Sequence, residues 1–258
     1  MGWSTVRLLG ILTLLNMSTG AAWSSGTVYH VTMSGNDAND CSFAAPCATI
    51  ARVCDQITSG NGGLYAILIA DGNYAGGCSL AYYNMVNVTG NCSSPQSVVI
   101  DSGSSATGSA FWAQDHAILA LNCLTISSNT GSGVGIATRQ YAIADYSNVQ
   151  FGAMTTHVTV TEASKANCLS ATIVGDTTYH IFVSGLSYAS LSCPITVVSG
   201  NFKAFVLAVQ RSFVDAHGVS AVGSQTGFKY ILDSLTLGTG VDALPGTSGI
   251  VRNGAVVE

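Results

Sequence analysis

The sequence has few charged residues. Only 8% of its 258 residues are Asp, Glu, Lys or Arg, against a usual share of about 25%. The 8 Lys and Arg residues are scattered, and 13 acids outnumber them. Nucleic-acid binding needs clustered cations to neutralise phosphates, so this composition argues against it. The abundance of hydrophobic, hydroxyl, amide and small residues instead favours a sheet-rich protein with an apolar core.

The sequence also lacks an apolar run long enough to cross a membrane, which takes about 20 residues. A shorter run near the N-terminus, Leu8–Leu15, follows the cation Arg7 and precedes the small residues Gly20-Ala21-Ala22. That order is typical of a secretory signal peptide. We therefore expect residues 1–22 to be removed, the mature chain to begin near Trp23, and the protein to be secreted, extracellular or periplasmic.

Metal-binding cysteine motifs are missing as well, since there is no C-x-x-C pair and no histidine at ligand spacing. The 8 cysteines therefore indicate disulfides in an oxidising compartment. Cys41 and Cys47 flank a tight loop and form the first expected pair, and Cys78 and Cys92 form the second. The cysteines in β-rich stretches are expected to be buried free thiols: Cys123, Cys168 and Cys193.

One helix is predicted, over residues 46–57. Proline at its first turn favours a start at Pro46, and a glycine cluster after residue 59 ends it. Four apolar residues recur at the spacing of one helical face: Ile50, Val53, Cys54 and Ile57. We expect this stripe to cover the open end of the first coil of a solenoid, because uncovered sheet ends promote aggregation.

Apolar runs recur along the rest of the chain at steps of 22 to 25 residues. The recurring positions are Ile100, Leu124, Val149, Ile173, Ile195 and Val219. Alternation inside each repeat describes a coil whose inward side chains stack on the next coil. A propeller blade needs about 40 residues, and a β-sandwich, which stays open as an alternative, would show more hairpin turns. The prediction is an all-β, right-handed parallel β-helix over residues 23–258, with an N-terminal capping helix.

Several segments resemble a known family. Tyr29–Val31, Ser34–Asp37, Pro46–Ile50 and Ile67–Tyr74 resemble the N-terminal module of secreted pectin-lyase-like β-helix proteins. Ala243–Thr247 resembles the closing segment of β-helix proteins from bacterial prophages. The resemblance implies the fold more than an activity, since this superfamily holds lyases, hydrolases, tailspikes and adhesins. A signal peptide departs from the phage pattern and favours a cell-secreted relative.

Aligned repeats show no catalytic set of acids. A glycoside hydrolase needs two carboxyl groups about 5 to 9.5 Å apart, and a lyase needs Ca²⁺ held by carboxylates. Asp145 and Asp215 share a column but stand three rungs apart, roughly 14 Å, with Leu169 and Leu191 expected between them. We assign no catalytic residue. The acids expected to serve turns are Asp101, Asp176 and Asp233.

One column of turn residues is a candidate glycan site, because sugars stack on aromatic rings beside hydrogen-bonding groups. The alignment stacks His116, Tyr141, Lys165, Ser187 and Arg211, with Trp112 shortly before the first of them. A solvated turn row is the simpler explanation of the same column. The candidate binding residues are Trp112, His116, Tyr141, Lys165 and Arg211.

Two other polar groups have simple explanations. An Asx-rich stretch has side chains that Ca²⁺ would take, although an Asx turn is favoured: Asn36, Asp37, Asn39 and Asp40. Apart from that Ca²⁺, we expect no metal and no cofactor. The remaining histidines share no evident spacing and are expected at the surface or in turns: His30, His157, His180 and His217.

The sequence favours a secreted, non-catalytic β-helix that recognises a polysaccharide or surface glycan, or that serves as an adhesin-like scaffold. A polysaccharide lyase or glycoside hydrolase is one alternative. A phage-derived tail or receptor-binding component is the other, and trimerisation would be expected for it.

Overall fold

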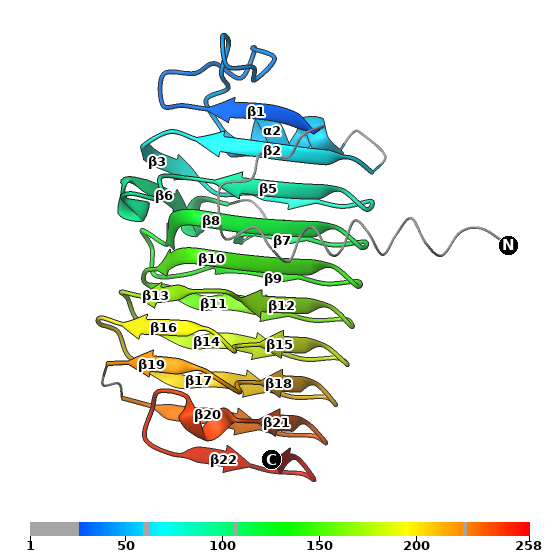
Figure 1. Ribbon diagram of the computed structural model, residues 1–258, viewed down its shortest axis with the longest axis vertical. Helices are drawn as coiled ribbons and strands as arrows, with labels where there is room; N and C mark the ends of the chain where they lie inside the picture. Colours follow the sequence, from blue (N-terminus) through cyan, green and yellow to red (C-terminus); the bar gives the residue numbers. More distant parts are fainter. Residues whose placement is uncertain (1–25, 59–61, 106–107, 224–225) are drawn as a thin grey trace, which may run out of the picture.

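The computed structural model describes residues 26–58, 62–105, 108–223 and 226–258, so the predicted signal peptide lies outside the described residues. The chain forms a right-handed parallel β-helix of stacked coils, as the sequence predicted (Figure 1). Within the described ranges, no helix is both long and apolar enough to cross a membrane.

A fifteen-stranded sheet, sheet A, forms two sides of the solenoid. Its main path consists of β1 (Thr27–Val31), β2 (Leu64–Ile69), β5 (Met85–Thr89), β8 (Ile118–Ser127), β10 (Ile143–Phe151), β12 (Lys165–Cys168), β15 (Tyr188–Ser190), β18 (Phe213–Asp215), β21 (Leu237–Thr239) and β23 (Val256–Val257). Its side branch consists of β3 (Gly72–Ala75), β6 (Val98–Asp101), β13 (Ala171–Ile173), β16 (Pro194–Val197) and β19 (Ser220–Val222). The long strands β8 and β10 pair with strands of both parts.

An eight-stranded sheet, sheet B, forms the remaining side. It consists of β4 (Cys78–Leu80), β7 (Ser109–Ala113), β9 (Val134–Thr138), β11 (Met154–Val160), β14 (Thr177–Val183), β17 (Phe202–Ala208), β20 (Phe228–Leu232) and β22 (Gly249–Val251). Short 3-10 turns lie at Pro95–Ser97, Ser102–Ser104 and Val241–Ala243. Each coil therefore passes through sheet B, the main path of sheet A and the side branch in turn.

The interior repeats with the predicted period, but the predicted register is partly wrong. Leu124 pairs with Val149, which pairs with Ala171, so that column continues to Ile195 as expected. Ile100 and Ile173 belong instead to the next inward column, two residues further on, since Ile100 pairs with Ile126. The coils differ in length by a few residues. Where one coil is shorter, an alignment at constant spacing therefore matches a residue to the next inward side chain, two residues away.

The helix α2 (Ile50–Thr58) packs against β4, the first strand of sheet B. It lies beside β1 and β2 at the N-terminal end of the solenoid, as the lid prediction required (Figure 1). Its whole predicted stripe is buried: Ile50, Val53, Cys54 and Ile57. The helix begins later than predicted, because Thr49 caps it through a hydrogen bond from the Arg52 backbone N–H, at 3.2 Å. Pro46 therefore lies in the preceding loop.

Four disulfides bind neighbouring segments of the solenoid, and they correct most of the predicted pairing. Cys41–Cys47 is formed as predicted. The pair Cys78–Cys92 was wrong, and so were the three free thiols: the other bonds are Cys54–Cys78, Cys92–Cys123 and Cys168–Cys193. Cys54–Cys78 ties the capping helix α2 to β4, whereas Cys92–Cys123 and Cys168–Cys193 each join a strand of sheet A to a segment of a neighbouring coil.

A row of two-residue turns joins sheet B to sheet A along one margin of the solenoid, on the right in Figure 1. Both residues of every turn have positive φ: Tyr82-Tyr83, Asp115-His116, Gln140-Tyr141, Glu162-Ala163, Gly185-Leu186, Gln210-Arg211, Ser234-Leu235 and Asn253-Gly254. In every turn but the last, the backbone N–H of the second residue donates to the carbonyl of the first residue one coil below, at 2.8 to 3.3 Å. We call this row the turn edge.

Candidate functional site

Three rings stack on consecutive levels of the turn edge. The Tyr83 and His116 ring centroids lie 4.7 Å apart with planes inclined by 14°, and those of His116 and Tyr141 lie 5.1 Å apart at 16°. All three side chains are exposed. A non-glycine residue with positive φ costs on the order of 1 kcal/mol, so the coil turn holds these rings in a conformation that free peptide avoids. We call the three rings the aromatic ladder.

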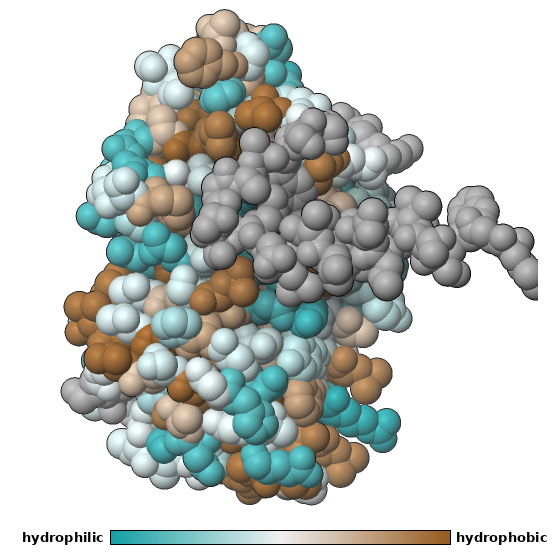
Figure 2. Space-filling view, viewed as in Figure 1, coloured by the Kyte–Doolittle hydropathy of each residue, from teal (hydrophilic) through white to brown (hydrophobic). Residues whose placement is uncertain are grey.

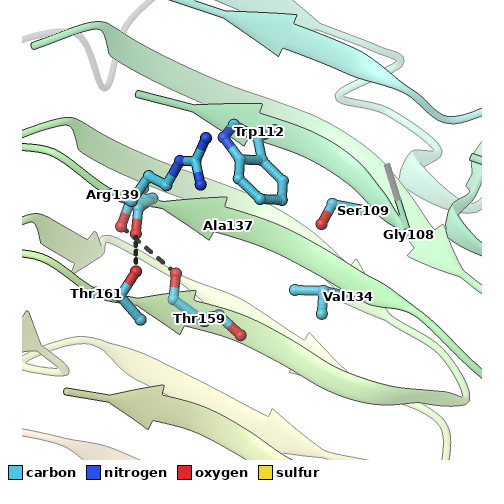
Figure 3. A pocket seen from close by; sticks show the side chains of 9 residues that line it. Gly108, Ser109, Trp112, Val134, Ala137, Arg139, Thr159 and Thr161 are labelled. Carbon is cyan, nitrogen blue, oxygen red and sulfur yellow. Dashed lines mark hydrogen bonds between the residues drawn. The ribbon is translucent and has the colours of Figure 1, made fainter. Parts of the chain in front are cut away.

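A pocket of about 180 Å³ lies on the outer face of sheet B (Figure 3). Arg139 of its lining precedes Tyr141 of the ladder by two residues. Its lining is mostly apolar and includes Trp112, Val134 and Ala137, with the hydroxyl-bearing residues Thr159 and Thr161 on the coil below. Register explains this grouping, because Trp112 pairs with Ala137 and Ala137 with Thr159, so their side chains point outward in one column.

Arg139 and Gln114 hold the Trp112 indole in place. The guanidinium carbon of Arg139 lies 4.5 Å from the centre of the indole ring, a cation–π contact. Gln114 Oε1 accepts hydrogen bonds from Trp112 Nε1 at 3.2 Å, Arg139 Nε at 3.0 Å and Arg139 Nη2 at 2.7 Å. The indole and the guanidinium are thereby fixed before any ligand arrives, as Figure 3 shows for their relative positions.

The structure brings together three of the five predicted binding residues. Trp112 and His116 lie on one coil and Tyr141 lies on the next, so the pocket and the ladder are built on the same coils. Arg139 and Gln114 are part of the same surface and were not predicted. The alternation of inward and outward side chains along a strand could have suggested them. It places Gln114 on the same outer face as Trp112, and Arg139 follows Gln114 by one coil.

Lys165 and Arg211 lie apart from this group. Lys165 pairs with Ile143 and Tyr188 on the outer face of sheet A, and its Nζ stands 5.0 Å from the Tyr188 ring centre. The column predicted for it contains Ala163 instead, and Ser187 is buried. Arg211 does lie on the turn edge, but three levels below Tyr141, roughly 14 Å away. The short coil between Tyr141 and Ala163 caused this misalignment.

The acids show the separation that was predicted. Asp145 pairs with Asn167 on the next strand, Asn167 pairs with Ser190, and Ser190 pairs with Asp215. The two carboxylates are therefore three rungs apart. The residues between them are Asn167 and Ser190, however, and not Leu169 and Leu191. Asn167 Nδ2 donates to Asp145 Oδ1 at 2.5 Å, yet burial dominates and raises the pKa of the Asp145 carboxyl.

Asp215 has the opposite balance. Partial burial alone would raise its pKa, but hydrogen bonds from the backbone and ring of His217 and from the Tyr188 hydroxyl outweigh it and lower the pKa. The three acids predicted to serve turns do so. Asp101 accepts from the Gly103 backbone N–H, Asp176 from the Asn201 backbone N–H, and Asp233 from the Asn253 side-chain amide.

The Asx-rich stretch fastens the loop ahead of α2. Asp37 Oδ1 accepts from the backbone N–H groups of Ala48 and Thr49, both at 2.9 Å, and its Oδ2 accepts from Thr49 Oγ1 at 2.7 Å. Asn36 and Asp40 each bond to the backbone two residues on. The bonds of Asn36 and Asp40 are Asx-turn bonds. Within the described ranges, no cluster of three or more His, Cys, Asp or Glu side chains could hold a metal ion.

Two histidines predicted at the surface are fully buried, which corrects that prediction. His157 and His180 lie on adjacent coils with their Nδ1 atoms 2.8 Å apart, and His157 Nε2 lies 3.0 Å from the Gly152 carbonyl. Burial lowers the pKa of His157 to about 3, and burial together with the neighbouring ring lowers that of His180 well below its usual range. Both rings are therefore neutral at ordinary pH, one donating to the other.

Comparison with known proteins identifies the fold. No protein-family profile matches the chain, and no curated protein matches it in sequence. The pectin methylesterase from Aspergillus niger in deglycosylated form matches with a TM-score of 0.54 at 13% identity, over 93% of this chain and 87% of that chain. A second structure of that protein, penultimately deglycosylated, gives 0.53 at 15% identity with the same coverage.

Pectin methylesterase PemA from Erwinia chrysanthemi covers 91% of this chain with 92% of its own, at 14% identity and a TM-score of 0.47. Identities this low concern the fold alone. The two Aspergillus niger structures, together with the strand pairing, show that the chain has a right-handed parallel β-helix fold. Its activity has to be argued from its own side chains.

Proposed function

We propose that the protein is secreted and binds a polysaccharide, without cleaving it, across the Trp112 pocket and the aromatic ladder. The observation that carries this proposal is the indole of Trp112, fixed by Arg139 and Gln114 beside a shallow apolar pocket. Rigid aromatic faces with planar hydrogen-bond donors at their edge suit the apolar C–H face and the ring hydroxyls of a sugar.

The surroundings of the pocket support the same ligand class. Thr159 and Thr161 add hydroxyl groups at one end, and the pocket is shallow and open along the surface. A polymer needs such a surface, because neighbouring units must continue past the binding site, whereas a small-molecule cofactor would be enclosed. The four disulfides are typical of the oxidising compartments in which extracellular polysaccharides are met.

The separation of the acids supports binding without hydrolysis. Asp145 and Asp215 stand three rungs apart in one outward column, and that distance exceeds the carboxyl separation of about 5 to 9.5 Å that glycoside hydrolysis uses. On the turn edge, Asp115 and Glu162 stand two rungs apart, about 10 Å, with Gln140 between them. An adhesin-like scaffold would share this lack of a paired acid but would not need the fixed indole.

The test is a glycan array probed with the oxidised mature protein, followed by calorimetry on each hit. Methylated and demethylated pectin belong in the array, since the solved structures of similar fold are pectin methylesterases. We expect Trp112→Ala to weaken binding at least roughly tenfold, the loss of one aromatic contact of about 1.4 kcal/mol.

Phe182→Ala is the matched control. Phe182 pairs with Thr159 and stands in the same outward column of sheet B, one level below the pocket. It should leave affinity unchanged. Equal loss in both variants would contradict the assignment to Trp112. Release of reducing ends, unsaturated sugars or methanol from any bound polysaccharide would contradict the non-catalytic part and establish an enzyme.

A further inference from the structure

The aromatic ladder is interrupted one level below Tyr141. The next residue of its column is Ala163, and the one after that is Leu186, as the hydrogen bonds from Tyr141 to Glu162 and from Ala163 to Gly185 establish. Tyr141 and Leu186 are 62% and 69% exposed, so two large side chains project on either side of a methyl group. We call the gap bounded by Tyr141, Ala163 and Leu186 the notch.

The notch has the height of one ring. Adjacent levels are about 4.8 Å apart, so Tyr141 and Leu186 are separated by about 10 Å along the axis. A ring placed over Ala163 would lie at the same distance from Tyr141 as the ladder rings lie from one another, 4.7 and 5.1 Å. One face of Tyr141 is covered by His116, and its other face is turned toward the notch.

The notch adjoins the Trp112 pocket. Arg139 and Thr161 line the pocket, and only Gln140 and Glu162 separate them from Tyr141 and Ala163 along the chain. A strand residue advances about 3.3 Å, so the two sites lie within the length of neighbouring units of one polymer. A chain bound on Trp112 can therefore pass around the turn edge into the notch.

Charge selects the kind of unit. The carboxylates Asp115 and Glu162 stand on the turn edge on either side of Gln140. The nearest cations keep their charge but are held by contacts outside the notch, since Arg139 bonds to Gln114 and stacks on Trp112 one coil above, and Lys165 lies over Tyr188 on the outer face of sheet A. An acidic sugar would meet like charges here, whereas an uncharged one would not.

We propose that the notch is a subsite for one uncharged pyranose ring, which stacks on Tyr141 and completes the aromatic ladder over Ala163. This inference rests on the proposed polysaccharide binding and specifies where a second unit of the ligand lies. The ligand class is a polysaccharide with neutral units, and the small side chain at Ala163 determines the specificity of the subsite.

The test fills the notch without touching the pocket. Ala163→Leu places a side chain where the sugar would lie, and the turn tolerates it, because Leu186 and Leu235 occupy the equivalent position with φ of 62° and 63°. Ala163→Ser keeps the notch open and is the matched control. Circular dichroism and the melting temperature verify that both variants fold as the parent does.

The probes are cello-, xylo-, manno- and maltohexaose, with oligogalacturonate as the acidic comparison, titrated by calorimetry. We expect a neutral hexasaccharide to bind more tightly than oligogalacturonate, Ala163→Leu to weaken it roughly tenfold, and Ala163→Ser to leave it unchanged. Unchanged affinity in Ala163→Leu, with loss in Trp112→Ala, would overturn the notch and leave the pocket standing. Preference for oligogalacturonate would also overturn it. Binding of none of the probes or array glycans would overturn both proposals.

Discussion

Among the described residues, two groups of three or more rings are packed face to face or edge to face, one outside the solenoid and one inside. Outside, Tyr83, His116 and Tyr141 stack in nearly parallel planes. Inside, His157 and His180 lie between two phenylalanines, Phe151 and Phe205, with centroids 4.6 to 5.1 Å apart and varied inclinations. The rise of the coil sets the spacing of the outer rings and of His157, His180 and Phe205, which lie on successive strands of sheet B, whereas Phe151 packs on His157 from β10 of the same coil. The planes of the inner rings are inclined by 19° to 77° to one another, because each ring is packed by core side chains. The planes of the outer rings differ by only 14° and 16°, because identical turns on successive coils carry them.

The two stacks also differ in what a ligand can reach. Every face of the inner stack is covered by core side chains, so its contacts can stabilise the fold only. The outer stack ends at Ala163, and one ring face is left open to solvent there. The comparison assigns stability to the inner stack and binding to the outer one, and each prediction below tests that division.

The largest expected effect comes from the same substitution made in both stacks. His157→Ala leaves a cavity in the core and removes the partner of His180 Nδ1, so we expect it to lower the free energy of unfolding by about 3–5 kcal/mol. His116→Ala should change it by less than about 0.5 kcal/mol, because the ring is exposed. Denaturant titration measures both. Similar losses of unfolding free energy in the two variants would contradict the assignment of stability to the inner stack alone.

Acid should destabilise the protein through the inner pair. The pKa of each buried histidine is lowered on folding, so their contribution is complete above the unfolded pKa of about 6.5 and is lost as pH falls toward 3. Unfolding takes up two protons in this range, and the free energy of unfolding should fall by about 3–4 kcal/mol between pH 7 and pH 5.

The control for that prediction replaces both buried rings. The ring neighbours of the pair are Phe151 and Phe205, which do not titrate. His157→Leu combined with His180→Leu should therefore flatten most of the acid dependence, whatever its stability at neutral pH. An equally steep loss in the double variant would place the acid sensitivity in the carboxylates.

A small effect on stability and a larger one on binding are expected at the pocket, where Arg139→Lys retains the charge. Lysine cannot stack as a plane on Trp112 or donate two bonds to Gln114, so we expect glycan affinity to fall about tenfold. The free energy of unfolding should change by less than about 1 kcal/mol. A large loss of stability with intact binding would assign Arg139 to the inner, structural group.

Much of the fold could be predicted from the sequence, because its signals are local. The stripe of Ile50, Val53, Cys54 and Ile57 identified the lid, and the step of about two dozen residues identified the coil. The register could not be obtained in the same way. The coil from Tyr141 to Ala163 is about two residues shorter than the usual step. The alternation of apolar residues continues through it unchanged, so no local signal in the sequence marks where it is shorter.

The missed contacts follow from that register. Cys54 and Cys78, Cys168 and Cys193, and His157 and His180 are all separated by about one coil, a signal that becomes visible only once the period is applied to polar and sulfur side chains. Arg139 and Gln114 were missed for another reason. The alternation along the strand places Gln114 on the same face as Trp112 and Arg139 one coil on, but the pattern does not specify the hydrogen bonds that join them to the indole.

The most direct measurement of the central claim follows Trp112 itself. Trp3 and Trp23 are the other two tryptophans, so a chain carrying Trp3→Phe and Trp23→Phe has Trp112 as its single indole. Its fluorescence is titrated with each polysaccharide that calorimetry shows to bind. We predict a saturating change in emission with the calorimetric affinity, because the sugar stacks on this ring. Full binding with an unchanged Trp112 emission would contradict the assignment of the pocket.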